Sequence, residues 1–80
     1  MASKQEKSAT QVLNENNVGH LFYQGPFAGA DHTDHEPKWY CNVYVNGQLQ
    51  GSSYGQKNKK EAKEMAAADA AVRLGLIQRG

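Results

Sequence analysis

Four lysines lie close together at the start of a segment rich in helix-forming residues: Lys57, Lys59, Lys60 and Lys63. Asn58 is a suitable N-cap, so the segment predicts a helix whose first turns carry these ammonium groups. Cations at a helix N-terminus oppose the macrodipole and cost about 0.3–1 kcal/mol each at low salt. An anion outside that end would meet free backbone N–H groups, the positive end of the dipole and several cations. The pattern therefore favours a phosphate-binding surface over a merely solvated lysine face.

The rest of the chain is small and its charge is unevenly distributed. Its 80 residues are 39% hydrophobic and 21% charged, which permits one core and leaves no room for a second, catalytic domain. Residues 1–37 carry two lysines and five carboxylates, a net charge of −3, whereas residues 38–80 carry seven basic and three acidic residues, a net charge of +4. The overall charge of +1 therefore hides a basic second half.

Cysteine content and hydropathy indicate where in the cell the protein is expected. Cys41 is the only cysteine, so the chain forms no internal disulfide and lacks the paired cysteines of zinc fingers. No apolar run approaches the roughly 18 residues that cross a bilayer, and residues 1–8 lack the hydrophobic segment of a signal peptide. These features predict an intracellular protein, in the cytoplasm or nucleus, with no membrane partner.

The first half of the chain predicts one helix and one strand ahead of the lysines. Ser8 is a suitable N-cap for a helix of under three turns, whose apolar stripe includes Leu13 and which ends by Gly19. Residues 20–24 are aromatic and bounded by glycines, which indicates a strand. Residues 25–37 contain several Gly and Pro residues and no apolar spacing, so we expect a loop there.

The second half predicts a hairpin followed by the lysine-bearing helix. Residues 39–45 alternate with period two and place on the core face Trp39, Cys41, Val43 and Val45. Asn46-Gly47 favours a type I′ turn, and residues 48–54 can pair back as an antiparallel strand. Residues 59–74 form an alanine-rich helix that can lie close to a sheet, and Gly75 ends it. The order predicts an α+β fold, α-β-β-β-α, with a three-stranded antiparallel sheet and both helices packed on one face.

The lysine segment also carries a family motif. Lys59-Lys60-Glu61-Ala62-Lys63, followed by Ala66-Ala67, resembles the K-K-x-A-K-x-x-A-A core of double-stranded RNA-binding domains. The resemblance runs from about Ser8 to Leu76 and implies the α-β-β-β-α order reached above. It implies binding of double-stranded RNA through A-form shape and phosphate and 2′-hydroxyl contacts, with little sequence preference over about 16 base pairs. We expect a monomeric domain at 8–77, with tails at 1–7 and 78–80, alone or within a larger parent protein.

The resemblance assigns RNA contacts to three regions. In the first helix, Leu13-Asn14-Glu15 is similar to the family's L-[NQH]-E step, which implies minor-groove contacts by Ser8, Gln11, Asn14 and Glu15. In the loop before the middle strand, alignment of the family's Phe with Trp39 implies contacts by His35 and Lys38. The family's Gly-Pro pair does not fall in register there, because Gly25-Pro26 lies further upstream.

The third region is the lysine cluster itself. Lys59, Lys60 and Lys63 match the family's motif position for position, Asn58 occupies the place of the usual Ser, and Lys57 is an additional candidate. The resemblance implies that this region bridges the major groove through phosphates. Three regions at fixed separation would distinguish an A-form duplex from B-form DNA.

Other chemistries are less well supported by the residues. His32 and His35 have a short metal-ligand spacing, but no fourth ligand is evident and Cys41 is assigned to the core. A Cys/His nucleophile is disfavoured because burial raises the pKa of a thiol. Trp39 and Tyr40 could stack on single-stranded bases, although Trp39 is assigned to the core. The sequence therefore predicts a protein without a metal site, without a cofactor and without enzymatic activity.

One alternative from another class stays open. The same fold can serve as a protein–protein interaction or dimerisation module with weakened RNA binding, and the altered loop and modest net charge favour it. The lysines of the motif argue against it. Salt separates the two functions, because RNA contacts give a steep log–log salt slope and an apolar interface gives a nearly flat one.

Overall fold

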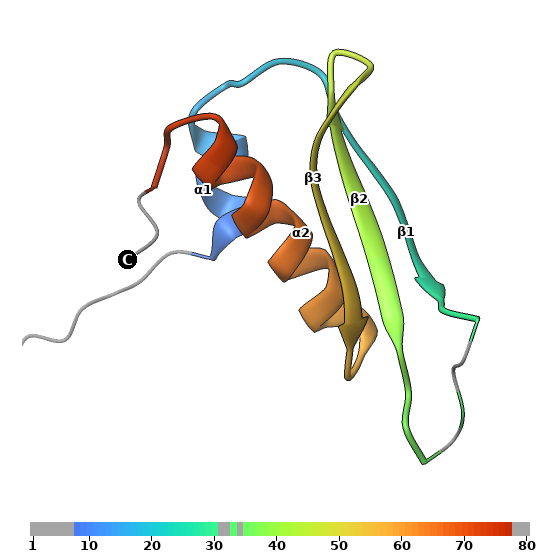
Figure 1. Cartoon of the computed structure of the whole chain (residues 1–80). Coiled ribbons are helices and arrows are strands. Elements are labelled where there is room, and N and C mark those ends of the chain that lie inside the picture. Colours follow the sequence, from blue (N-terminus) through green and yellow to red (C-terminus); the bar gives the residue numbers. More distant parts are fainter. Residues whose placement is uncertain (1–7, 31–32, 34, 78–80) are drawn as a thin grey trace, which may run out of the picture.

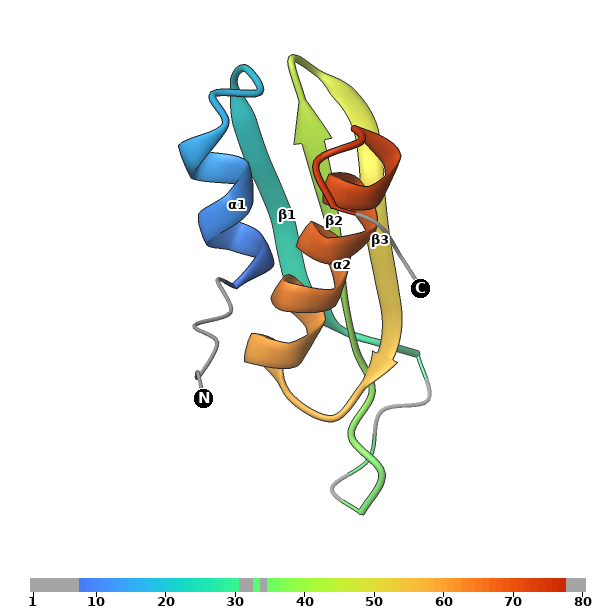
Figure 2. The same cartoon turned by 90° about the vertical axis from the view of Figure 1, so that its left-hand side faces the viewer.

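The computed structural model describes residues 8–30, 33 and 35–77, and five elements follow one another: α1 (Ala9–Glu15), β1 (Leu21–Ala28), β2 (Trp39–Val45), β3 (Gln48–Gln56) and α2 (Lys59–Arg73). The strands form one antiparallel sheet in the order β1-β2-β3. Figures 1 and 2 show both helices on the same face of that sheet. The predicted α+β fold is confirmed. The predicted tails lie outside the described residues, and the boundaries 8–77 stay a prediction.

Both helices begin at the capping residues that the sequence predicts. The Ser8 hydroxyl accepts a hydrogen bond from the Gln11 N–H at 3.2 Å, and the Asn58 side-chain oxygen accepts one from the Glu61 N–H at 2.8 Å. Each cap satisfies a backbone donor that the first turn leaves without an intrahelical partner. The start of α2, where the lysines lie, is therefore well defined.

The first strand is longer than the sequence predicts, so the loop assigned to residues 25–37 is wrong at its beginning. β1 begins at Leu21 and continues to Ala28, and its pairing with β2 shifts between Gln24 and Phe27. This irregularity takes up Gly25 and Pro26, joined by a cis peptide bond. A bulge tolerates a proline because the extra residue needs no ladder hydrogen bond. The connection to β2 therefore starts at Gly29, whose N–H donates a 2.7 Å hydrogen bond to the Lys38 carbonyl.

The hairpin between β2 and β3 matches its prediction. Asn46 and Gly47 have φ values of 53° and 82°, the two positive values of a type I′ turn. Asn46 also joins this turn to the start of β1: its side-chain oxygen accepts the His20 N–H and its own N–H donates to the His20 carbonyl, both at 2.9 Å. The three strands are therefore held together at this end of the sheet.

The core lies between the sheet and the helices and is built largely from small residues. Leu13, Cys41, Val43 and the alanine stripe of α2 are buried. α2 approaches β3 so closely that a Cβ added at Gly51 would lie 2.5 Å from the Ala70 backbone nitrogen. The expectation that small side chains let this helix lie close to the sheet is confirmed. None of the described helices is long and apolar enough to span a membrane.

Candidate nucleic-acid interface

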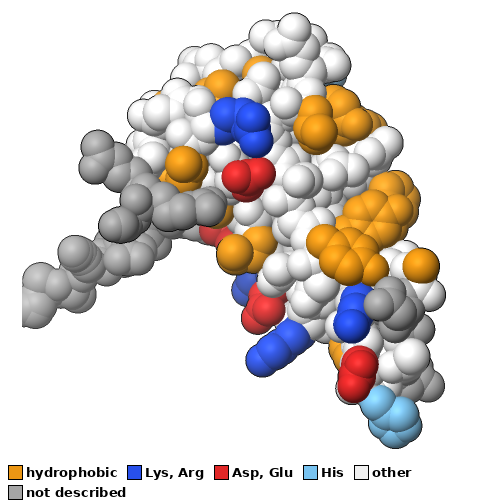
Figure 3. Space-filling view, in the orientation of Figure 1, with side chains coloured by type: hydrophobic (Ala, Val, Ile, Leu, Met, Phe, Trp, Pro, Cys, Tyr) orange, Lys and Arg blue, Asp and Glu red, His pale blue; other side chains and the backbone are white. Residues whose placement is uncertain are grey.

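The lysine cluster lies exposed at the N-terminal end of α2. Lys57, Lys59, Lys60 and Lys63 are all exposed, and Glu61 is the acidic residue of the first turn. Figure 3 shows basic side chains at the lower part of the molecule, where Figure 1 places the start of α2. The ammonium groups, the helix dipole and the first N–H groups of α2 together create a positive potential at this end.

Two of these lysines lie over aromatic rings of the sheet. The Lys59 ammonium is 5.2 Å from the centre of the Trp39 ring, and the Lys63 ammonium is 4.6 Å from the centre of the Tyr23 ring. Such cation–π contacts contribute about 0.5–1 kcal/mol each at exposed sites. They restrict the positions of two ammonium groups and offset part of the cost of placing cations at a helix N-terminus.

The rings beneath the lysines are parts of this site that the sequence reasoning does not identify. The alternating pattern places Trp39 in the core, and the ring is in fact half-buried against it. Tyr23 alternates with Phe22 and Gln24, so period two could have placed it with Leu21 on the helix side of β1. Its hydroxyl is buried and has no hydrogen-bond partner among the described residues. The available signal is an aromatic residue at a strand position that faces the helix carrying the lysines.

Burial keeps the groups under the cluster neutral. It raises the pKa of Tyr23 above the ordinary value of 10.0, with smaller contributions from Cys41 and Glu64. Burial likewise raises the pKa of the Cys41 thiol above 9.0, although Lys63 acts in the opposite direction. A fully buried thiol with a raised pKa is a poor nucleophile. Tyr23 and Cys41 therefore contribute no negative charge beneath the lysines.

A shallow pocket joins the start of α1 to the lysine cluster. It has a volume of about 180 Å³ and is lined by Ser8, Thr10, Lys60, Lys63 and Glu64. The Glu64 carboxylate accepts a hydrogen bond from the Ala9 N–H in the first turn of α1. This contact links the two helices through the end of α1 that needs an acceptor. The structure thus brings together residues from the first and third predicted regions.

The other predicted residues of α1 are exposed along the helix. Gln11, Asn14 and Glu15 are all exposed, and the Gln11 side-chain amide donates to the Glu15 carboxylate at 3.0 Å. This contact between residues four apart lies on one side of α1. Of the predicted α1 residues, Ser8 alone is among those that line the pocket shared with the lysines.

His35 and Lys38, the predicted contacts of the second region, lie before β2. Lys38 immediately precedes β2, which begins at Trp39, and the Trp39 ring lies under Lys59. His35 is exposed within the loop, where the Glu36 N–H donates to the Thr33 hydroxyl at 2.8 Å. Neither Lys38 nor His35 is among the residues that line the pocket with Ser8.

The possible metal site at His32 and His35 lies partly outside the described residues, because His32 is not among them. Among the residues that the structure describes, no group of three His, Cys, Asp or Glu residues could hold a metal ion. Cys41 is fully buried in the core, as its position in the alternating strand predicts.

The fold and the exposed cationic helix end define a small α-β-β-β-α domain with a surface suited to a polyanion. Residues 24–72, more than half of the chain, match the family described as the Double-stranded RNA binding motif. The chain belongs to this family. Membership supports double-stranded RNA as a partner and a role in binding it. No curated protein matches the sequence. The match includes the loop and the lysine cluster, whereas α1 lies before it.

Proposed function

We propose that residues 8–77 form a domain that recognises the A-form shape of double-stranded RNA through phosphate and 2′-hydroxyl contacts, with little sequence preference. The observation that carries this proposal is the pocket shared by Ser8, Lys60 and Lys63. It places a polar residue of α1 beside two cations of α2, so one RNA backbone can meet both helices. The family match supports the nature of the partner.

The lysine cluster supplies most of the affinity in this proposal. Its four exposed ammonium groups lie where the dipole of α2 also attracts anions. Phosphates carry no base information, so these contacts favour duplexes regardless of sequence. The rings under Lys59 and Lys63 restrict those two side chains before RNA binds, which lowers the entropy cost of binding.

Helix α1 distinguishes RNA from DNA in this proposal. Asn14 and Glu15 are exposed, and Glu15 is already held by Gln11. A carboxylate repels phosphates but accepts hydrogen bonds from 2′-hydroxyl groups, which line the wide minor groove of A-form RNA. DNA lacks these groups. We assign the second minor-groove contact to the loop, through His35 and Lys38.

Binding measurements with three matched nucleic acids test the proposal. We expect a duplex RNA of about 20 base pairs to bind more tightly than the DNA duplex of the same sequence and than either single strand. Fluorescence anisotropy across a salt series should give a steep negative log–log slope. Equal affinity for the RNA and DNA duplexes would reject recognition of A-form shape, and a flat salt slope would reject phosphate binding.

Substitution of the cluster provides the second half of that test. Lys59→Ala combined with Lys60→Ala should weaken duplex RNA binding tenfold or more and lower the salt slope by about one unit for each phosphate that is no longer neutralised. The control is Arg73→Ala, which removes a positive charge from the opposite end of the same helix. Because the double variant loses two charges and Arg73→Ala loses one, a reduction half as large on a logarithmic scale for Arg73→Ala would mean that net charge, rather than the cluster, determines affinity.

A further inference from the structure

The face of the sheet that points away from the helices carries large exposed hydrophobic side chains. The outer sheet face is defined here by Phe22, Phe27, Tyr40, Tyr44, Leu49 and Tyr54. Four of them are strongly exposed: Phe22 by 54%, Phe27 by 43%, Leu49 by 53% and Tyr54 by 56%. Figure 3 shows hydrophobic side chains along the side occupied by the strands.

The rings of the outer sheet face form two groups of contacts, and one group spans all three strands. The ring centres of Phe27 and Tyr40 are 5.3 Å apart, those of Tyr40 and Tyr54 are 6.0 Å apart, and those of Phe22 and Tyr44 are 6.2 Å apart. These are normal distances for tilted aromatic pairs. Large side chains are therefore packed side by side on a surface that no element of the described chain covers.

The area of this surface is large for so small a domain. Phe and Tyr side chains bury about 150–250 Å² each, so the three rings left about half exposed present about 300 Å², to which Leu49 adds a smaller area. Exposed apolar surface of this order is often functional. Two such faces, with the half-buried tyrosines added, would bury about 1,000 Å² in total, which corresponds to the lower end of specific interfaces.

The charge of the strands selects the kind of partner. None of the three strands contains a Lys, Arg, Asp or Glu residue. At the centre of the face, the Asn42 amide donates to the Gln24 side-chain oxygen at 2.9 Å, so these polar groups already satisfy each other in part. A single-stranded nucleic acid needs cations along its backbone in addition to rings. A second copy of this neutral face brings no like charges together.

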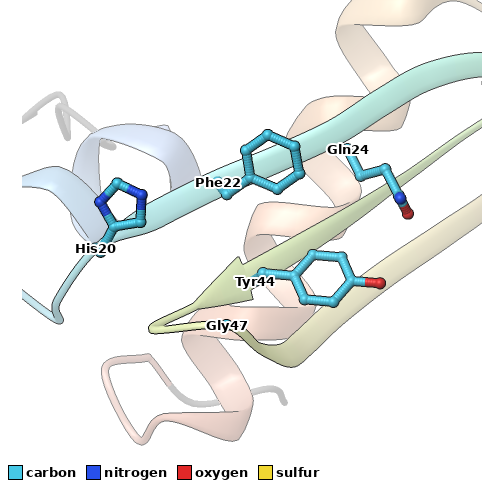
Figure 4. A pocket seen from close by; sticks show the side chains of 5 residues that line it. All are labelled: His20, Phe22, Gln24, Tyr44 and Gly47. Atoms are coloured by element: carbon cyan, nitrogen blue, oxygen red, sulfur yellow. The ribbon is translucent and has the colours of Figure 1, made fainter.

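A hollow at one end of the face is suited to a ring from that second copy. Figure 4 shows it between His20, Phe22, Gln24 and Tyr44, next to Gly47 in the β2–β3 turn. Its volume is about 290 Å³. Phe27 lies toward the other end of β1, paired with Tyr40. A two-fold axis across the strands would superimpose β1 on β1 in the opposite direction and bring Phe27 of each copy to the hollow of the other.

We propose that the outer sheet face binds a second copy of the chain, sheet against sheet in this reversed arrangement, to form a weak symmetric dimer. Sheets packed in this way lie about 10 Å apart and interdigitate their side chains. The dimer replaces the monomer that the sequence predicts. Because the helices of the two copies would lie on opposite outer sides, a dimer would present two duplex-binding surfaces; this consequence rests on the proposed function, whereas dimerisation does not.

Sedimentation of the wild-type chain over about 1 μM to 1 mM, without nucleic acid, tests the dimer. We expect a reversible monomer–dimer equilibrium, with Phe22→Asp or Tyr54→Asp weakening association at least tenfold. Both residues are exposed, and retained circular dichroism and thermal unfolding would show that the variants fold. The control is Met65→Asp, which adds the same charge at a residue of α2 that is 47% exposed and should leave association unchanged. A monomeric wild type, or equal effects of all three substitutions, would overturn the proposal.

A mixing experiment tests the arrangement of the two copies. Phe22→Asp and Phe27→Lys should each be monomeric alone, whereas their mixture should associate, because the reversed arrangement places the new carboxylate opposite the new ammonium group once per heterodimer. No association on mixing would overturn the reversed arrangement. If instead wild type is monomeric and Phe22→Asp loses affinity for a single-stranded RNA, the face is a nucleic-acid surface and the dimer is rejected. Duplex RNA affinity of Phe22→Asp separates this result from failure of the proposed function.

Discussion

The two faces of one small sheet differ in the size of their side chains and in what covers them. On the helix side, Cys41, Val43 and Gly51 are buried beneath an alanine-rich helix. On the other side, Phe22 and Tyr54 are more than half exposed. The largest fully buried side chain is Leu13, and the rings of Trp39 and Tyr23 pack against this core only in part. Small residues allow α2 to approach closely, and the aromatic residues opposite need another explanation than folding.

A pair of leucines gives the largest expected contrast between the two faces. Leu13→Ala should lower the free energy of unfolding by about 2–5 kcal/mol, because this side chain is 0% exposed and its removal leaves a cavity. Leu49→Ala, at a residue 53% exposed, should cost less than about 1 kcal/mol. Urea denaturation at low protein concentration measures both without a contribution from dimerisation. Similar losses of stability in the two variants would mean that the outer face stabilises the monomer.

Alkaline pH should distinguish the tyrosines of the two faces. Burial raises the pKa values of Tyr23 and Cys41 above 10.0 and 9.0, so the unfolded chain loses these protons first as the pH rises. The contribution of Cys41 to stability is present below about pH 9 and that of Tyr23 below about pH 10, and each is lost as the pH rises through the raised pKa. We expect the melting temperature to fall as the pH rises above about 9, and to fall less steeply above about pH 10 in Tyr23→Phe, which keeps the ring under Lys63.

Tyr54→Phe is the control for that measurement, because Tyr54 is 56% exposed on the outer face. The effect of the buried Tyr23 hydroxyl is the part of the change in pH profile that Tyr54→Phe does not reproduce. Tyr23→Phe should also be at least as stable as the wild type near neutral pH, since it removes a buried hydroxyl that lacks a described partner. A Tyr23→Phe profile as steep as the wild-type profile would show that this hydroxyl does not ionise on unfolding in that range.

Local rules predict much of the fold. Ser8 and Asn58 are recognisable caps, Asn46-Gly47 is a strong turn signal, and the alanine stripe of α2 follows helical spacing. The extension of β1 was not predictable in this way. Gly and Pro at 25–26 usually end a strand, and only the pairing of Phe27 with Tyr40 shows that the sheet continues beyond them.

The sequence predicts the charged residues of the candidate site. It does not predict the tertiary contacts that hold those residues in place. Charge and motif identify the lysines, because those signals are contiguous in the sequence. The contact of Glu64 with Ala9 joins residues 55 positions apart, and the ring of Tyr23 under Lys63 joins a strand to a helix. Such contacts depend on how the helices cross the sheet. The outer sheet face was not predictable for the same reason. The period-two pattern of a strand shows which side chains share a face, but it does not show which face the helices cover.

The smallest expected effect separates two neighbouring lysines of the cluster. Both oppose the dipole of α2, but Lys59 alone of the two has a described ring contact, with Trp39 at 5.2 Å. Lys60→Ala should therefore raise the free energy of unfolding by up to about 1 kcal/mol at low salt. Lys59→Ala should leave it nearly unchanged, because relief of the dipole and removal of a cation–π interaction are similar in size.

Thermal unfolding at about 20 mM and 500 mM salt measures this difference. Salt screens the dipole term, so the advantage of Lys60→Ala should shrink at the higher concentration. Lys60→Arg is the matched control, since it keeps the positive charge and should show no gain. A drop of several degrees in the melting temperature of Lys60→Ala would mean that this lysine stabilises the fold, and its position at the helix end would then need no anionic partner to explain it.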